Sequence, residues 1–170
     1  MLKPPDMKLY HALFLVSGIV FVQGCVSSRN HLVLDAVGPA PGANHLAGPK
    51  GVLMVYSAFD QLAHFSGSIY RRYHTDYKIM SEDGKVLQNV RNDAGGVMED
   101  PRPVELQVGR YRIVARANGY GWVTVPVLVV AHEVTIVHLE GGSAWANDKP
   151  LASNSVQLPD GRIAGWRAEQ

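Results

Sequence analysis

The sequence predicts an all-β protein that folds as a single antiparallel β-sandwich of about seven strands. Apolar and polar residues alternate through 104–116, and this period of two is typical of strands with one buried side. Turn signals separate the apolar stretches, and the clearest are Asp83-Gly84 and Asn118-Gly119. Because these dipeptides tolerate the positive φ angles of tight turns, they favour hairpins between neighbouring strands.

The predicted strands follow one another along the chain with loops between them. They cover residues 52–57, 76–80, 86–90, 104–108, 110–116, 122–130 and 134–139. The first is apolar almost throughout, as in strands that are buried on both faces. Pro126 has no N–H donor, so its strand is expected to lie at a sheet edge or to contain a bulge there. Residues 58–74 lack a clear period and are expected to be mainly loop.

Residues 1–24 differ from the rest of the chain and are predicted to be a cleaved signal peptide. Lys3 and Lys8 precede a run from Leu9 to Val22 that is mainly apolar and has no Asp, Glu, Lys or Arg. This is the layout of secretory signals. A helix over this run would span about 21 Å, which is shorter than the ~30 Å core of a bilayer. A permanent membrane-spanning helix is therefore the weaker interpretation.

Cys25 is the only cysteine of the chain and lies just after this run. The string Val22-Gln23-Gly24-Cys25 resembles the lipobox of bacterial lipoproteins. The resemblance implies cleavage before Cys25, acylation of Cys25 and anchoring of the mature protein in the membrane. In some lipoproteins an Asp directly after the cysteine holds the protein at the inner membrane. This chain has Val26 there, so the resemblance favours the outer membrane in a cell that has two membranes. A buried free thiol beside an ordinary cleavage site is the alternative.

Three parts are predicted for the mature chain. Residues 25–51 are expected to be a lipid-anchored flexible tether, because proline and glycine recur there and disfavour regular structure. The string HLVLDAV within this range has the composition of a short strand. Residues 52–141 are expected to form the sandwich, and residues 142–170 an extension that packs on it. A small hairpin is expected at 159–161 in this extension.

The segment VELQVGRYRIVARANGY, residues 104–120, resembles the β-sandwich modules called PEGA and carboxypeptidase-regulatory-like domains. These modules are similar to the transthyretin-like (prealbumin-like) and starch-binding-like sandwiches of immunoglobulin-like architecture. The matching residues are Val104, Leu106, Gly109, Tyr111, Ile113, Ala115, Gly119 and Tyr120. The resemblance implies an accessory, non-catalytic module that is often extracytoplasmic and sometimes binds carbohydrate.

Signals for catalysis and for metal or cofactor binding are weak. His132 and His138 would lie about 20 Å apart in a strand, too far to share one ion. His138 and Glu140 share a face, but two ligands do not make a site. No cofactor motif is visible. A hydrolase that uses His74 and Asp76 on one face of an extended segment is a weakly supported alternative.

Candidate ligand-binding residues lie in an aromatic, cationic segment and near the C-terminus. They are Tyr70, Arg71, Arg72, Tyr73, His74, Tyr77, Trp145 and Trp166. Aromatic faces beside cations suit stacking on sugars or clamping of anionic groups. The alternative is that the tyrosines belong to the core of a strand and that the tryptophans cover an edge or end of the sandwich.

A row of arginines is predicted on the outward side of one strand. Arg110, Arg112 and Arg116 alternate with apolar residues, and together they would span about 20 Å. Such a row suits an anionic partner, or else it is a solvated face paired with Glu105 or Glu99.

The sequence as a whole predicts a non-catalytic, lipid-anchored module of the bacterial cell envelope, with its folded domain outside the cytoplasm. It would bind or scaffold through protein or polysaccharide contacts. A subunit of a larger envelope assembly is the alternative. Nucleic acid is not an expected partner, because the net charge of +1 gives no cationic footprint for a phosphate backbone.

Overall fold

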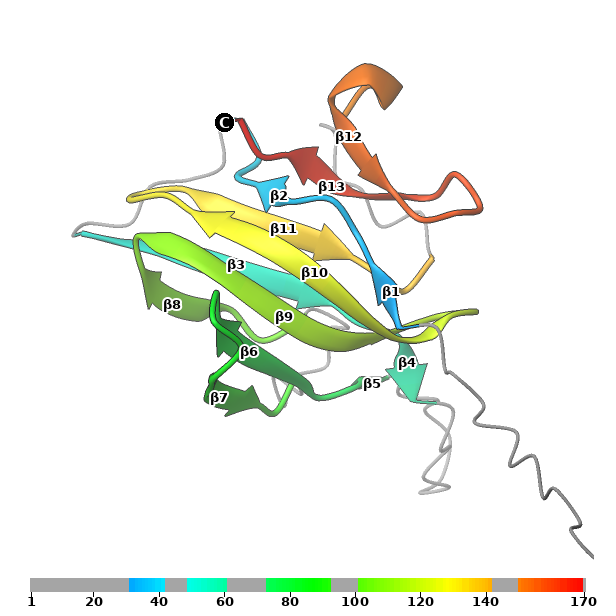
Figure 1. Cartoon of the computed structure of the whole chain (residues 1–170), viewed down its shortest axis with the longest axis horizontal. Helices are drawn as coiled ribbons and strands as arrows, with labels where there is room; N and C mark the ends of the chain where they lie inside the picture. The colour runs from blue at the N-terminus through cyan, green and yellow to red at the C-terminus, as the bar shows by residue number, and fades with distance from the viewer. Residues whose placement is uncertain (1–30, 42–48, 61–72, 93–100, 142–149, 170) are drawn as a thin grey trace, which may run out of the picture. The chain divides into compact units, whose positions relative to one another are not determined.

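The computed structural model describes residues 31–41, 49–60, 73–92, 101–141 and 150–169. All of them belong to one compact unit that begins at His31. The described ranges contain thirteen strands and one short 3-10 helix, η1 (Ala152–Asn154), which confirms the predicted all-β class and a sandwich of two facing sheets (Figure 1).

The larger sheet contains eight strands. They are β1 (Leu32–Val33), β2 (Val37–Gly38), β6 (Tyr77–Ser81), β7 (Val86–Val90), β9 (Gly109–Ala117), β10 (Gly121–Val129), β12 (Ser155–Gln157) and β13 (Ile163–Arg167). Their order is β12-β13-β2-β10-β9-β6-β7, and β1 pairs with β10 as β2 does. This leaves β7 and β12 at the edges.

Two smaller groups of strands complete the domain. The three-stranded sheet has the order β11-β3-β8, with β3 at Lys50–Tyr56, β8 at Val104–Gln107 and β11 at Val134–His138. A separate two-stranded ribbon pairs β4 (Phe59–Asp60) with β5 (Tyr73–His74). Figure 1 shows β3 and β11 lying along β9 and β10, so the two larger sheets face each other.

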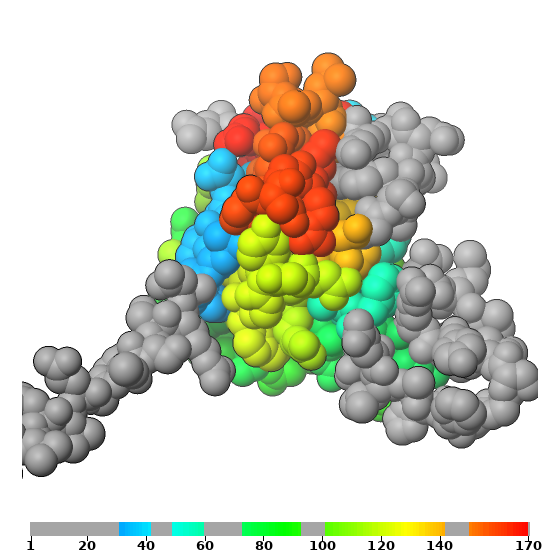
Figure 2. All heavy atoms as spheres, turned by 90° about the vertical axis from the view of Figure 1, so that its right-hand side faces the viewer, coloured from blue at the N-terminus to red at the C-terminus, as the bar shows by residue number. Residues whose placement is uncertain are grey.

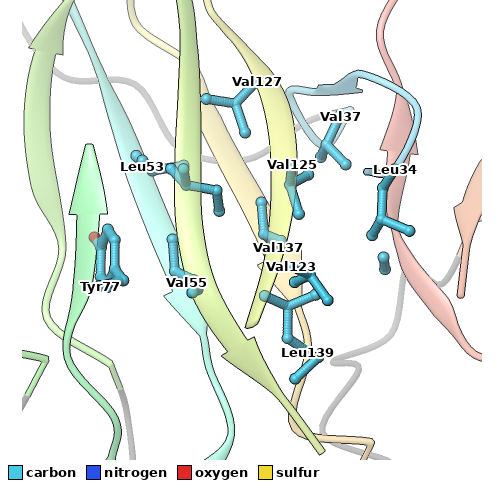
Figure 3. Close-up of a cluster of buried hydrophobic side chains, with 14 of the residues drawn as sticks. Leu34, Val37, Leu53, Val55, Tyr77, Val123, Val125, Val127, Val137 and Leu139 are labelled. Carbon is cyan, nitrogen blue, oxygen red and sulfur yellow. The ribbon is translucent and has the colours of Figure 1, made fainter. Parts of the chain in front are cut away.

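The hydrophobic core lies between these two sheets. Every second residue of β10 from Val123 to Val129 is buried, because successive side chains of a strand point to opposite faces. Burial of one such side chain contributes about 1.5–3 kcal/mol. The core side chains labelled in Figure 3 are Leu34, Val37, Leu53, Val55, Tyr77, Val123, Val125, Val127, Val137 and Leu139.

The pairing of the strands is mixed, although we predicted an antiparallel sandwich of about seven strands. The hairpin β9–β10 and the pairs β6–β7 and β6–β9 are antiparallel, as expected. However, β1 and β2 run parallel to β10, and β3 runs parallel to β11. Parallel neighbours need long connections, and here the intervening strands supply them.

The predicted tether over residues 25–51 is too long. The structure places β1 and β2 inside this range and starts β3 at Lys50. Leu34 and Val37 reach the core, so their burial outweighs the effect of the prolines and glycines nearby. Residues 25–30 and 42–48 lie outside the described residues.

The C-terminal extension is part of the larger sheet. β12 and β13 form the hairpin predicted at 159–161, and β13 pairs antiparallel with β2.

Pro126 does not lie in an edge strand, because β10 has neighbours on both sides. It falls between the contact of β10 with β1, at Thr124, and its contact with β2, at Val127. The interrupted ladder on that side accommodates a residue without an N–H donor.

Candidate functional site

The outward side of β9 presents the predicted row of arginines. Arg110, Arg112 and Arg116 are exposed, whereas Ile113 and Ala115 between them point into the core. This arrangement follows from the alternation of side chains along a strand. We name the outward side of β6, β9 and β10 the outer face.

Neighbouring strands extend this face on both sides of the row. On β10, Trp122 lies directly opposite Arg116, and 47% of its surface is exposed. On β6, Lys78 lies opposite Val114 and adds a fourth exposed cation. Neither Trp122 nor Lys78 was among the residues predicted from the sequence, although both alternate with buried neighbours and this alternation is visible in the sequence.

The arginines of the outer face have no ion pair within the described residues. Glu105, one of the partners considered for them, lies on the three-stranded sheet and pairs with Lys50 at 3.5 Å. Glu99 lies outside the described ranges. The pKa of Asp83 is lowered mainly by a hydrogen bond from the Ser81 hydroxyl, and Arg112 adds a smaller electrostatic effect. The outer face can therefore offer its cations to an anionic partner.

The aromatic, cationic segment does not form a surface site with the described residues. Tyr77 is only 1% exposed and lies opposite Val90 at an inward position of β6, and burial raises the pKa of its hydroxyl group. His74 is 5% exposed. Neither side chain therefore presents its ring at the described surface. Tyr73 is half-buried. The residues of this prediction that lie outside the described ranges are Tyr70, Arg71 and Arg72.

The structure describes one of the two tryptophans predicted to bind a ligand. Trp166 is half-buried in β13, where it lies opposite Gly38 on one side and Ser155 on the other. This position suits the interpretation that Trp166 covers part of the sandwich better than an exposed platform. Trp145 lies outside the described residues.

A second feature is a group of half-buried aromatic rings and buried imidazoles at the ends of β3 and β11. Tyr56 stacks on His138 with ring centroids 4.4 Å apart, and it meets His74 edge to face at 5.5 Å. Phe59 stacks on the same His74 at 4.7 Å. Nδ1 of His138 lies 2.8 Å from Oε1 of Glu140. We name these five residues the ring cluster.

Hydrogen bonds to the main chain hold the ring cluster in place. His74 donates through Nδ1 to the carbonyl oxygen of Ser57, 2.6 Å away. The side-chain amide of Asn92 donates to the Val55 carbonyl at 2.8 Å and to the Ser57 hydroxyl at 3.0 Å. The Ser57 hydroxyl in turn donates to the carbonyl of Thr75. These contacts join β3 to the segments around β5 and after β7.

His74 and Asp76 do not contact each other as an acid–base pair among the described residues; each bonds to the main chain instead. His74 contacts the main chain of Ser57 rather than its hydroxyl. Asp76 accepts a hydrogen bond from the backbone N–H of Asn92 at 3.1 Å instead of orienting His74. In the part of the chain that the structure describes, no three His, Cys, Asp or Glu side chains come close enough to share a metal ion.

Two more findings concern the chain as a whole. None of the described segments is a helix long and apolar enough to cross a bilayer. No family model matches the chain, and comparisons with curated proteins and with solved structures likewise find no match. What this protein does must therefore be inferred from its own residues and geometry.

Proposed function

We propose that this chain is a lipid-anchored, non-catalytic module of the bacterial cell envelope that binds or scaffolds at the envelope surface. Protein or polysaccharide partners are the contacts it would make there. The observation that supports a binding role most directly is the outer face, where exposed arginines have no ion pair among the described residues. Cations that are not neutralised within the fold favour an anionic partner.

The anchor is supported by the position of Cys25. It is the only cysteine of the chain, and it precedes His31, where the compact described unit begins. Cleavage before Cys25 would remove none of the described strands. Acylation would also remove the one thiol, which in a secreted protein is open to unwanted disulfide exchange.

The anchor is tested by labelling cells with an alkyne-bearing fatty acid. The wild-type chain is expected to take up the label and to fractionate with membranes, whereas Cys25→Ala is expected to take up none. Inhibition of the lipoprotein signal peptidase should leave the wild-type protein longer by residues 1–24, as read by intact mass. A Cys25→Ala protein that is still labelled, or wild-type protein without label, would refute the anchor.

A subunit of a larger envelope assembly is the second candidate function, and the edge strand β7 favours it. Among the described strands β7 pairs with β6 alone, and Val86 and Leu87 on it are exposed. Exposed apolar edge strands are templates for pairing with another chain. Co-purification after gentle solubilisation should then yield a fixed partner that Leu87→Lys loses. Leu151→Lys, at another exposed leucine, is the matched control and should retain it.

A further inference from the structure

We propose that the outer face docks on the anionic headgroups of the membrane in which Cys25 is anchored. This proposal rests on the lipid anchor proposed above. It adds that the sandwich lies against the bilayer with a defined face instead of hanging free of it.

The covalent chain between the anchor and the fold is short. Residues 26–30 separate Cys25 from His31, the first residue of the described unit. Even a fully extended chain spans at most about 22 Å between the Cα atoms of residues 25 and 31. An acylated Cys25 would thus keep the beginning of β1 within reach of the headgroup layer.

The chain enters the fold beside the exposed tryptophan. β1 pairs with β10 in parallel, with Leu32 opposite Val123 and Val33 opposite Thr124. Residue 31 therefore lies next to Trp122, and the described N-terminal segment, blue in Figure 2, lies beside the yellow-green end of the β9–β10 hairpin. The point of entry therefore lies beside the end of the outer face that carries Trp122 and Arg116.

Apolar side chains on this end suit the membrane interface. Val33 is 61% exposed and Trp122 is 47% exposed. Leu32 precedes Val33, and Val123 follows Trp122. Because Leu32 and Val123 point toward the core, Val33 and Trp122 both point outward. Tryptophan is enriched at the level of lipid headgroups because its ring is amphipathic.

The charges of the outer face complement an anionic surface. Arg110, Arg112, Arg116 and Lys78 are exposed there. Lys50, Arg162 and Arg167 each pair with a carboxylate, whereas Lys85, Arg91 and Arg102 are exposed and, among the described residues, also have no ion pair. Anionic lipids attract basic groups that lie within a Debye length of them.

Three exposed acidic residues lie near the outer face, and one of them is Glu82 in the β6–β7 turn. Asp83 lies in the β6–β7 turn near Arg112, at the end of β9 away from Trp122. Asp76 precedes β6 and accepts the Asn92 N–H. The four cations of the outer face thus outnumber the three carboxylates near it in the described part of this surface. An anionic polysaccharide would meet the same cations and stack on Trp122, but it gives no role to exposed Val33 or to the short link between Cys25 and this end of the domain.

The test uses the acylated protein reconstituted into vesicles that contain brominated phosphatidylcholine, with or without phosphatidylglycerol. Bromine on the lipid quenches a tryptophan that reaches the bilayer. Flotation with the vesicles measures anchoring separately. We expect about twofold stronger quenching when phosphatidylglycerol is present. Trp122→Phe should remove this increase, because the other two tryptophans provide only the background.

The matched variants are Arg112→Ser/Arg116→Ser on the outer face and Lys50→Ser/Arg102→Ser elsewhere. The first pair should abolish the increase, and the second should retain it, although both remove two charges. Vesicles that float but show equal quenching with and without phosphatidylglycerol would overturn the docking proposal alone. Failure to float would overturn the anchor. Retention of the protein on immobilised polygalacturonate is measured with the same variants. If this retention depends on Arg112 and Arg116 and the vesicle quenching does not, the outer face binds polysaccharide and the membrane proposal is wrong.

Discussion

Nδ1 of His138 lies 2.8 Å from Oε1 of Glu140, and both side chains are buried just where β11 ends. The ring of Tyr56 stacks on the imidazole. The side-chain amide of Asn118 donates a hydrogen bond to the main-chain carbonyl of Glu140. The pair therefore links β11 to β3 and to the β9–β10 turn, and it stabilises one end of the sandwich.

Removal of one partner should expose the strength of this link. Glu140→Ala leaves a buried imidazole without its carboxylate, so we expect a loss of about 3 kcal/mol in the free energy of unfolding. Urea denaturation measures it. Glu105→Ala is the control, because Glu105 and Lys50 form an exposed pair, which contributes about 1 kcal/mol or less. Equal losses in the two variants would contradict a stabilising role for the His138–Glu140 contact.

Tyr77→Phe should stabilise the protein. The Tyr77 hydroxyl is buried and has no hydrogen-bond partner within the described residues, and such a group costs about 1–3 kcal/mol of desolvation. We expect the free energy of unfolding to rise by about 1 kcal/mol when the oxygen is removed. Tyr73→Phe, at a half-buried position of β5, should change it by less than about 0.5 kcal/mol. A clear loss of stability in Tyr77→Phe would mean that the hydroxyl has a partner.

Tyr77 should also make the fold sensitive to alkali. Burial raises the pKa of its hydroxyl group, so the folded protein keeps the proton when the unfolded chain releases it near pH 10. The unfolded state then binds fewer protons, and stability falls as the pH rises above about 10. Thermal unfolding from pH 8 to 11 should show a steeper decline for the wild-type protein than for Tyr77→Phe. Parallel curves would show that Tyr77 does not cause the decline.

The N-terminal strands should matter for stability. Val37 is fully buried in β2, so Val37→Ala should cost about 2 kcal/mol in the free energy of unfolding. Val33→Ala, at an exposed position of β1, should cost less than about 0.5 kcal/mol. Urea denaturation distinguishes the two. If residues 25–51 were only a tether, as the sequence predicted, neither change would affect stability.

Gly51 should be intolerant of a side chain. A Cβ atom at this position of β3 would clash with the carbonyl oxygen of Val130 and would lie 2.8 Å from Cγ1 of Val129. The backbone must shift to relieve such contacts, so Gly51→Ala should destabilise the protein by about 1–3 kcal/mol. Gly109→Ala is the control, because its Cβ would meet only Tyr111 at ordinary contact distances. Similar thermal midpoints for the two variants would contradict the tight packing of β3 against the end of β10.

Much of the sandwich could be predicted from the sequence because its longest strands alternate in polarity. The alternation on β9 predicted that Arg110, Arg112 and Arg116 face outward, and the turn residues predicted the hairpins of β6–β7, β9–β10 and β12–β13. β1 and β2 were missed as part of the sheet, because strands of two residues are too short to show a period.

Contacts between distant strands could not be predicted from local patterns. Glu105 pairs with Lys50 rather than with an arginine, and this choice depends on the register of β8 against β3. Tyr77 was placed in a ligand site because its segment is rich in tyrosine and arginine. Its inward position was nevertheless indicated by Lys78, which separates it from the buried Ile79.

The pairing of β1 with β10 has a consequence for how the chain reaches its folded state. His31 and Thr124, which share a hydrogen bond, are 93 positions apart. Contacts of such long sequence separation slow folding, since loop-closure entropy is lost before the contact forms. β1 emerges from synthesis long before its partner β10 exists. We therefore expect β1 to become ordered late and to depend on the completed β9–β10 hairpin as its template.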